Sequence, residues 1–433
     1  MSRAVPAPRG RYRRTRPAIA IACLMVLTAC SLSAKDNAAG AASTGTDDGG
    51  SYTTLSPGGP ETPADKAALA ALPATVQDTY AGFWNSTRLG PNPYAKWTPS
   101  KAPWKFCYSS AYQGNSWRVE GLNVAKNIVA QLATKGLVDG DLIVADANNS
   151  ASLQATQINT MVQQGCDVIL AMQPPSVGLC GAFNTALNSK VLVVAMQTGT
   201  DCTNVIHSDF GEYYTGAASA KWLVDKTGGK GTVVMCDGIP GVAAAEARQA
   251  GAKSVFAGAG MTVEEITGQW TPSTVKSEML KYLSTHQGSV AGVWDGGVCA
   301  VSVDQALRQA GKSVPFVTGF EGACSWLAAW KQNGNESIGF SQSAGQGVVE
   351  AMKVALRMLS GQQPKVNTLL YPLQTIDGSN FSKYYKAGMA LTSTCNAQPA
   401  GNQSVPDTYY DALFTGGNPA PQFDSKLDSL PIS

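Results

Sequence analysis

From residue 105 onward, short apolar runs alternate with longer segments in which apolar residues recur every three or four positions. The short runs, rich in β-branched residues, predict strands at 106–109, 142–145, 168–172, 191–196, 232–236, 262–267, 290–294, 314–320, 337–340 and 369–376. The longer segments predict helices at 117–134, 153–164, 274–283, 301–310 and 347–359. Strands that alternate with helices form βαβ units on parallel sheets, so the pattern predicts an α/β protein.

The alternation stops after Asp209 and begins again at residue 232, which predicts two doubly wound parallel-sheet lobes. We expect a hinge that the chain crosses three times, near Asp209, Gln342 and Tyr371. The expected lobes comprise residues 105–209 with 343–371, and 210–342 with 372–390. Ligands of open α/β sheets bind beyond the carboxyl ends of the strands, so we expect the functional site there.

The N-terminal residues have the layout of a secretory signal. An uncharged apolar run, 17–29, follows six arginines with no acidic residue among them: Arg3, Arg9, Arg11, Arg13, Arg14 and Arg16. The run is too short to span a bilayer as a mature helix. It ends in Leu-Thr-Ala before Cys30, an order that resembles a bacterial lipobox and implies cleavage before Cys30 and lipid attachment to its sulfur. The alternative is an ordinary signal peptide in which Cys30 falls near the cleavage site.

Three segments flank the predicted lobes. Residues 30–65 are rich in Ala, Gly, Ser, Thr and Pro and predict a flexible tether. Residues 66–104 form an N-terminal extension, in which a short helix is expected over 66–80 with an interruption at Pro73. Residues 391–433 form a C-terminal extension.

Charge and composition exclude one class of partner. Six of the 32 basic residues and none of the 30 acidic residues lie in residues 1–29, so the remaining chain has 26 against 30 and a formal net charge of −4. Nucleic-acid binding requires a clustered basic surface and is therefore not expected. Charged residues make up only 14% of the chain, against about 25% in typical proteins, which fits an extracytoplasmic protein.

Eight cysteines remain besides Cys23 and Cys30, and an even number in an exported chain predicts disulfides. We expect Cys180 to pair with Cys202, because the two flank one αβ unit. We expect Cys299 to pair with Cys324, because each follows a strand end in neighbouring units. No partner is assigned to Cys107, Cys166, Cys236 and Cys395. Without C-x-x-C spacing and with only two histidines, neither a metal site nor a cofactor is expected.

Polar and aromatic residues follow the first predicted strand in the sequence QGNSWR, residues 113–118. Asn115 or Ser116 is suited to cap the next helix, so part of this motif has a capping role. Trp117 and Arg118 place a stacking face beside a charged planar donor, which is how proteins hold sugars, although a core role is the alternative for Trp117. The candidate ligand-binding residues in this motif are Gln113, Asn115, Trp117 and Arg118.

Four segments together resemble a known family: GNSWR at 114–118, GIPGVAAAEAR at 238–248, GFEG at 319–322, and Ser-Gln at 341–342. In this order and spacing the chain is similar to the periplasmic-type substrate-binding proteins of ABC importers. The likeness is to the sugar-binding subgroup with the type I, ribose-binding-like fold, and it covers residues 105–380. It implies a two-lobed protein that captures a small polar ligand, most often a sugar, and delivers it to a membrane permease.

The resemblance implies roles for particular residues. Arg248 stands where the family places a ligand-binding arginine, and Trp270 where it has an aromatic residue over the sugar. Glu321 takes the place of a ligand-binding aspartate, since a carboxylate accepts hydrogen bonds from two hydroxyls. Gln342 matches a glutamine at a hinge crossing. Asp295 stands at or next to a polar family site, although two glycines follow it.

One strand end departs from the family pattern. In the family, the strand equivalent to 191–196 ends in Asp-Arg, which binds sugar hydroxyls. In this chain Gln197 and Thr198 follow Met196 instead. Gln197 is the candidate replacement, and it carries no charge. The ligand's identity therefore stays open between a sugar, a modified or deoxy sugar, and a non-sugar ligand such as a nucleoside or an amino acid.

Enzymatic function is not expected. The chain has no G-x-S-x-G motif, and the segment 311–313 resembles a P-loop ending, but Ala306 stands where that motif needs glycine. The expected protein is a monomeric binding lipoprotein on the outer face of the cell membrane, with a small-molecule ligand and an ABC permease as partners. The alternative is a lipoprotein that senses a ligand and signals to a membrane receptor or kinase.

Overall fold

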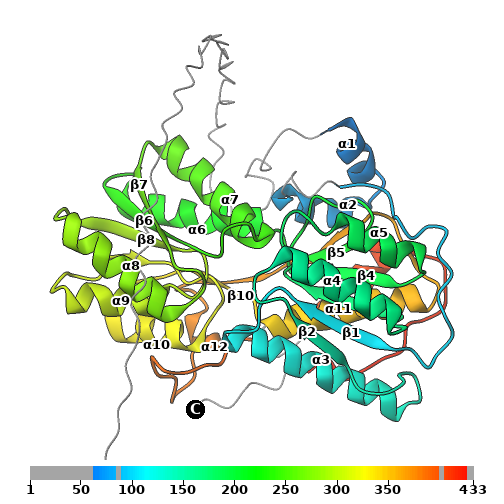
Figure 1. The fold of residues 1–433 in the computed structure, drawn as a ribbon. Helices are drawn as coiled ribbons and strands as arrows, with labels where there is room; N and C mark the ends of the chain where they lie inside the picture. Colours follow the sequence, from blue (N-terminus) through cyan, green and yellow to red (C-terminus); the bar gives the residue numbers. More distant parts are fainter. Residues whose placement is uncertain (1–61, 84–88, 399–403, 427–433) are drawn as a thin grey trace, which may run out of the picture. The chain divides into compact units, whose positions relative to one another are not determined.

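The structure is a computed structural model that describes residues 62–83, 89–398 and 404–426. Cys30, the predicted signal peptide and the tether up to residue 61 lie outside the described residues. Within the described part, two parallel sheets are each covered by helices on both faces (Figure 1). We call the six-stranded sheet with its helices the first lobe, and the four-stranded sheet with its helices the second lobe. The α/β prediction with two doubly wound lobes is confirmed.

The first lobe has strand order β12-β5-β4-β3-β1-β2, with every neighbouring pair parallel. Its strands are β1 Phe106–Ser110, β2 Ile143–Asp146, β3 Val168–Met172, β4 Leu192–Met196, β5 Ile206–Asp209 and β12 Thr368–Leu370. Its main helices are α3 Ser116–Thr134, α4 Ala151–Gln163, α5 Cys180–Asn188 and α11 Ala344–Leu359. Helices α3 and α11 pack on one face of the sheet, and α4 and α5 on the other.

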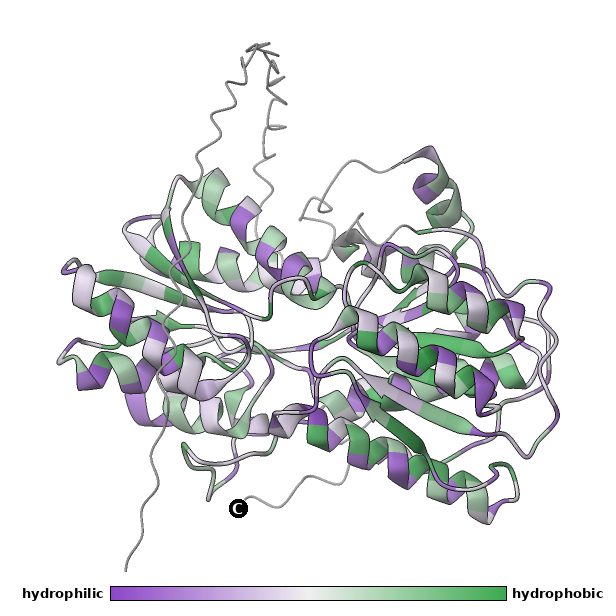
Figure 2. Ribbon diagram, viewed as in Figure 1, coloured by the Kyte–Doolittle hydropathy of each residue, from purple (hydrophilic) through white to green (hydrophobic). Residues whose placement is uncertain are grey.

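The near-continuous hydrophobicity of these strands follows from burial on both faces. In β3, Val168, Leu170 and Met172 point to the side of α3 and α11, whereas Ile169 and Ala171 point to the side of α4 and α5. A strand buried on both sides needs apolar residues at every position rather than at alternate ones. Figure 2 shows this contrast, with largely hydrophobic strands between helices that carry hydrophobic and hydrophilic positions in turn.

The second lobe has strand order β7-β6-β8-β9, again all parallel. Its strands are β6 Thr232–Asp237, β7 Thr262–Thr267, β8 Val290–Asp295 and β9 Phe316–Val317. Its helices are α6 Glu212–Thr227, α7 Ala243–Ala259, α8 Pro272–Thr285, α9 Ala300–Gln309 and α10 Cys324–Asn333. The pair α6 and α7 covers one face, and the pair α8 and α9 covers the other.

The strand predicted over 369–376 is two strands in two different sheets. Strand β12 adds to the first lobe beside β5, whereas β13, Gln374–Ile376, pairs antiparallel with β10, Gly339–Ser341. Pro372 lies between them and has no N–H for a sheet hydrogen bond, so the ladder is broken there. The single-strand prediction was therefore wrong, because apolar periodicity does not show which sheet a residue joins. The strand predicted over 314–320 is also shorter, Phe316–Val317.

The N-terminal extension and the later part of the C-terminal extension pack against the first lobe. The predicted helix over 66–80 is α1 Pro63–Ala70, α2 Ala74–Gln77 and the 3-10 helix η2 Asp78–Gly82, interrupted at Pro73 as expected. The Tyr80 hydroxyl donates to the Thr368 carbonyl and accepts from the Leu370 N–H at the sheet edge. The C-terminal extension adds α13 Asp407–Leu413 and β14 Phe414–Thr415, which pairs with β11 Gln363–Pro364, and the short helix α12 Phe381–Tyr384 precedes it.

Four disulfides lie within the described residues: Cys107–Cys166, Cys180–Cys202, Cys236–Cys299 and Cys324–Cys395. The prediction for Cys180 and Cys202 is confirmed, but the predicted bond between Cys299 and Cys324 was wrong. Strands β6 and β8 are neighbours, so Cys299 after β8 meets Cys236 at the end of β6. Cys324 instead meets Cys395, because the C-terminal segment pairs beside it through Ala323 and Asn396.

Candidate functional site

The first lobe presents Trp117 and Arg118 from the first turn of α3. The Asn115 side chain caps this helix, with Oδ1 accepting from the Arg118 N–H at 3.0 Å. The Trp117 indole N–H donates to the Gln342 carbonyl at 3.0 Å, so this residue has only its ring faces left for a ligand. Arg118 donates through Nη2 to Gln173 at 2.6 Å, whereas its buried Nε and Nη1 have no partner. Burial lowers the pKa of Arg118 to about 10.

Trp270 of the second lobe contacts arginines from both lobes. Its ring centroid lies 5.7 Å from the Arg118 guanidinium carbon and 5.5 Å from that of Arg248, within the range of cation–π contact. Its indole N–H donates to the Gly296 carbonyl at 3.0 Å, which fixes the ring. The predicted residues Arg118, Arg248 and Trp270 are therefore brought together, although they come from distant parts of the chain.

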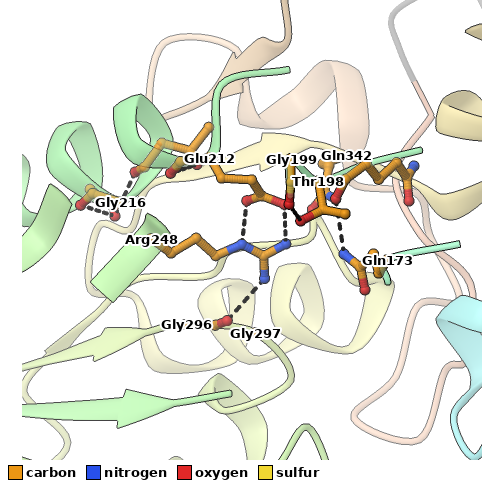
Figure 3. Close-up of polar contacts among 12 residues, drawn as sticks. Gln173, Thr198, Gly199, Glu212, Gly216, Arg248, Gly296, Gly297 and Gln342 are labelled. Atoms are coloured by element: carbon orange, nitrogen blue, oxygen red, sulfur yellow. Dashed lines mark hydrogen bonds and ion pairs between the residues drawn. The ribbon is translucent and has the colours of Figure 1, made fainter. Parts of the chain in front are cut away.

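Arg248 is held by a residue that the sequence did not indicate, Glu212 at the start of α6 (Figure 3). The Arg248 Nη2 lies 2.8 Å from Glu212 Oε1, its Nε also donates to the same carboxylate, and its Nη1 donates to the Gly296 carbonyl at 3.0 Å. The guanidinium carbon lies 3.8 Å from the centroid of the Phe320 ring. Burial raises the pKa of Glu212, and the Arg248 charge opposes that rise. Two guanidinium N–H bonds are left to bind a ligand.

Close packing of two helices makes this buried ion pair possible. A Cβ atom at Gly216 of α6 would lie 2.1 Å from the Arg248 carbonyl oxygen, and one at Gly251 of α7 would lie 2.1 Å from the Tyr213 carbonyl oxygen. Only glycine allows backbones to approach so closely. The two glycines thus place α7 against α6 at the distance from which Arg248 reaches Glu212.

The two predicted carboxylates have different roles. Asp295 accepts from the N–H groups of Gly297, Cys299 and Ala300 at 2.6, 3.1 and 3.0 Å, so its oxygens hold the loop between β8 and α9. Glu321 interacts with the backbone N–H of Val298 and lines the cavity described below. Its burial, followed by the nearby Asp295 charge, raises its pKa to about 7 against the opposing effect of the two site arginines.

The three predicted glutamines have different surroundings. Gln197 donates through Nε2 to the Ser343 carbonyl at 3.0 Å and so supports the start of α11. Gln342 is buried, and neither its amide oxygen nor its amide nitrogen has a partner. Gln113 lies close to the hydroxyl of Tyr108 on β1. Both Gln113 and Gln342 therefore have buried amide groups without a hydrogen-bond partner among the described residues, and such groups are costly unless a ligand binds them.

A cavity of about 420 Å³ lies beside this cluster. Of the predicted residues, Asn115, Trp117, Asp295 and Glu321 line it, whereas Gln113, Arg118, Gln197, Arg248, Trp270 and Gln342 do not. Phe320, Trp326 and residues 391–396 also line it. No sequence pattern indicated residues 391–396, because only the fold brings the C-terminal extension to this place.

Contacts between residues 175–176 of the first lobe and residues 241–242 of the second join the two lobes. The Ser176 N–H donates to the Gly241 carbonyl at 3.1 Å, and Pro175 bridges to Val242. The site thus lies between lobes that are in contact, with aromatic faces and polar groups converging from both. Such an arrangement suits a small ligand whose ring faces stack on aromatic residues and whose hydroxyls take directed hydrogen bonds.

Potential metal ligands come together at one place in the part of the chain that the structure describes. One group of potential ligands is close enough to share an ion, formed by Cys180, Asp201 and Cys202. The two sulfurs are bonded to each other, so they are not thiolates that bind a metal.

Comparison with known proteins identifies the class. Residues 106–363 match the family described as the periplasmic binding protein domain, which is more than half of the chain. The chain therefore belongs to this family of solute-binding proteins, which are not enzymes, and the family assignment implies an extracytoplasmic location. Among the described residues, none of the helices is long and apolar enough to cross a membrane.

Two curated relatives are similar to the chain. The xylitol-binding protein of Mycolicibacterium smegmatis is 26% identical over 251 residues, which covers 55% of this chain and 69% of that protein. The ribose import binding protein of Bacillus subtilis is 24% identical over 213 residues, which covers 48% of this chain and 68% of that protein.

Solved structures show the same fold. An ABC transporter solute-binding protein from Thermobispora bispora has a TM-score of 0.61 and 23% identity, over 71% of this chain and 94% of that one. A periplasmic solute-binding protein from Actinobacillus succinogenes, solved with D-allose, has a TM-score of 0.57 and 19% identity, over 66% and 100% of the two chains. The expected type I periplasmic binding protein fold is thus confirmed.

Proposed function

We propose that this protein captures a sugar or sugar alcohol between its two lobes and delivers it to an ABC import permease. The observation that carries the proposal is the meeting of Trp270 with Arg118 of one lobe and Arg248 of the other, near the buried carboxylate of Glu321. Charged planar donors, a carboxylate acceptor and aromatic faces are the groups that bind a polyhydroxyl ligand. The relatives that bind xylitol and ribose support this ligand class.

Hydrogen bonds between the ligand and both lobes would supply the binding energy when the lobes close. Two buried nitrogens of Arg118 and the buried amide of Gln342 have no hydrogen-bond partner among the described residues, so the site without ligand leaves polar groups unsatisfied. A hydroxylated ligand that pairs with them removes that cost, and it gains most when both lobes contact it at once. The proposed role therefore needs binding and lobe movement, and no chemical step.

A thermal-shift experiment tests the ligand class. The panel contains D-ribose, xylitol, D-allose, myo-inositol and L-arabinose, with nucleosides and amino acids as alternatives. A ligand that binds the native state is expected to stabilise the protein by about 2.7 kcal/mol at a concentration 100 times its Kd. Stabilisation by amino acids or nucleosides alone would contradict the proposed sugar class.

We further propose that Cys30 is the lipidated first residue of the mature protein and that residues 31–61, which precede helix α1, tether the folded part to the membrane. Mass analysis of the membrane fraction is expected to show an N-terminus at Cys30 with acyl chains. The variant Cys30→Ala is expected to leave the membrane fraction, because its lipid attachment point is removed. The variant Cys23→Ala is the matched control and should stay membrane-bound. Equal membrane retention of both variants would refute the anchor.

A further inference from the structure

The segment 391–398 of the C-terminal extension is fastened to the second lobe. The Cys324–Cys395 disulfide joins it to the start of α10. The Cys324 N–H donates to the Cys395 carbonyl at 2.8 Å, and the Ala397 N–H donates to the Gly322 carbonyl at 2.7 Å. The segment therefore has a fixed position beside the loop that carries Glu321.

The same segment is also bound to the first lobe. Asn396 Nδ2 donates to Glu120 Oε2 at 2.6 Å, and Gln398 Nε2 donates to Glu120 Oε1 at 3.1 Å. Glu120 belongs to α3 and is buried. The Ser343 hydroxyl donates to Gln398 Oε1 at 2.8 Å. Charge-assisted hydrogen bonds of this kind are stronger than those between neutral groups, so the segment spans both lobes at the cavity.

Residues 391–396, which lead into and include part of these attachments, form one wall of the 420 Å³ cavity. Thr392 and Thr394 are exposed, and their hydroxyls make no hydrogen bond within the described residues. The Ser393 hydroxyl, by contrast, accepts from the Ala390 N–H at 3.0 Å and holds the turn. The wall thus offers two free hydroxyls to the cavity on a fixed backbone.

The remaining walls are aromatic and neutral polar, with carboxylates as their only charged groups. Trp117, Phe320 and Trp326 supply apolar faces, and both indole N–H groups of the tryptophans are already bonded to protein oxygens. Asp295 and Glu321 are the charged residues in the lining, and among the described residues no Lys, Arg or His lines this cavity. A phosphorylated or acidic ligand would meet like charge without a counter-ion here, so the lining favours a neutral ligand.

The cavity's size indicates a ligand larger than one sugar ring. Its volume of about 420 Å³ lies beside the cluster of Arg118, Trp270 and Arg248 rather than within it. Pockets of about 300–1,000 Å³ hold drug-sized ligands, and a single pentose is smaller than these. A first ring against Trp117 and Glu321 therefore leaves room for a second ring against residues 391–396.

We propose that residues 391–396 are part of the ligand site and that Thr392 and Thr394 bind the second ring of a neutral disaccharide or glycoside. This inference rests on the proposed function and specifies its ligand class. The segment selects the longer ligand because a second ring adds contacts with its hydroxyls.

Isothermal titration calorimetry with the full-length chain tests the inference. The probes are trehalose, maltose, cellobiose, sucrose, lactose and melibiose, with D-glucose and D-ribose as monosaccharides and glucose 6-phosphate as the anionic sugar. We expect at least one disaccharide to bind more tightly than either monosaccharide, and glucose 6-phosphate to bind less tightly than D-glucose. The double variant Thr392→Val/Thr394→Val is expected to weaken disaccharide binding about tenfold and to leave monosaccharide binding unchanged.

The control is Thr262→Val, an exposed threonine on β7, which should bind every probe as the wild type does. If the wild type binds monosaccharides but none of the disaccharides, or if the double variant binds the disaccharide unchanged, the inference is overturned while the proposed function stands. If the wild type binds no sugar of either size, both are overturned.

Discussion

Replacing Glu212 with alanine is expected to destabilise the protein by about 3–5 kcal/mol, because it leaves the Arg248 guanidinium buried without its counter-ion. The two side chains are each only 2% exposed, so water does not replace the lost partner. Ligand affinity is expected to fall as well, since Glu212 fixes the direction in which Arg248 donates. Urea unfolding followed by circular dichroism measures the stability change.

Asp225→Ala is the matched control on the same helix. Asp225 pairs with Lys221 at 2.8 Å on the surface, and exposed pairs of this kind contribute only about 0–1 kcal/mol. The double variant Glu212→Leu/Arg248→Met is expected to recover most of the stability without recovering ligand binding, because no charge is then left unpaired. A Glu212→Ala protein as stable as the Asp225→Ala protein would show that the buried pair is not needed for folding.

Replacing Glu321 with alanine is expected to weaken ligand binding roughly tenfold to a hundredfold at pH 8, the cost of losing a hydrogen bond to a charged group. The pKa of Glu321 is raised to about 7, so its carboxyl is protonated below that pH. Ligand hydroxyls donate to the ionised carboxylate, and binding therefore favours the ionised form. Affinity is expected to rise as pH increases through about 7 and to level off above it.

The free protein should show the opposite trend in stability. The pKa of an unfolded glutamate is about 4.3, so between that pH and about 7 the native state holds a proton that the unfolded state has lost. The contribution of Glu321 to the free energy of unfolding therefore falls as pH rises across this window. Glu321→Gln should flatten the pH profile of ligand affinity, while the half-buried surface control Glu278→Gln on α8 should keep it. A pH-dependent affinity that persists in Glu321→Gln would assign the titration to another group.

The sequence alone determined the class of fold. Short, uniformly apolar runs such as 168–172 are typical of strands buried on both faces, and their alternation with amphipathic helices indicates parallel sheets. The GNSWR motif after the first strand also placed Trp117 and Arg118 correctly in the first turn of a helix. These features are local, since the period of apolar residues and the capping residue are both written within one element.

The tertiary structure decided what depends on residues far apart in the chain. Glu212 looked like an ordinary acidic residue at a helix start, and its role follows only from the close approach of α7 to α6 at Gly216 and Gly251. The partner of Cys299 depended on the order of strands in a sheet. The wall formed by residues 391–396 depended on the return of the C-terminal extension to the cavity. Such contacts arise from packing between elements, and no periodicity within one element encodes them.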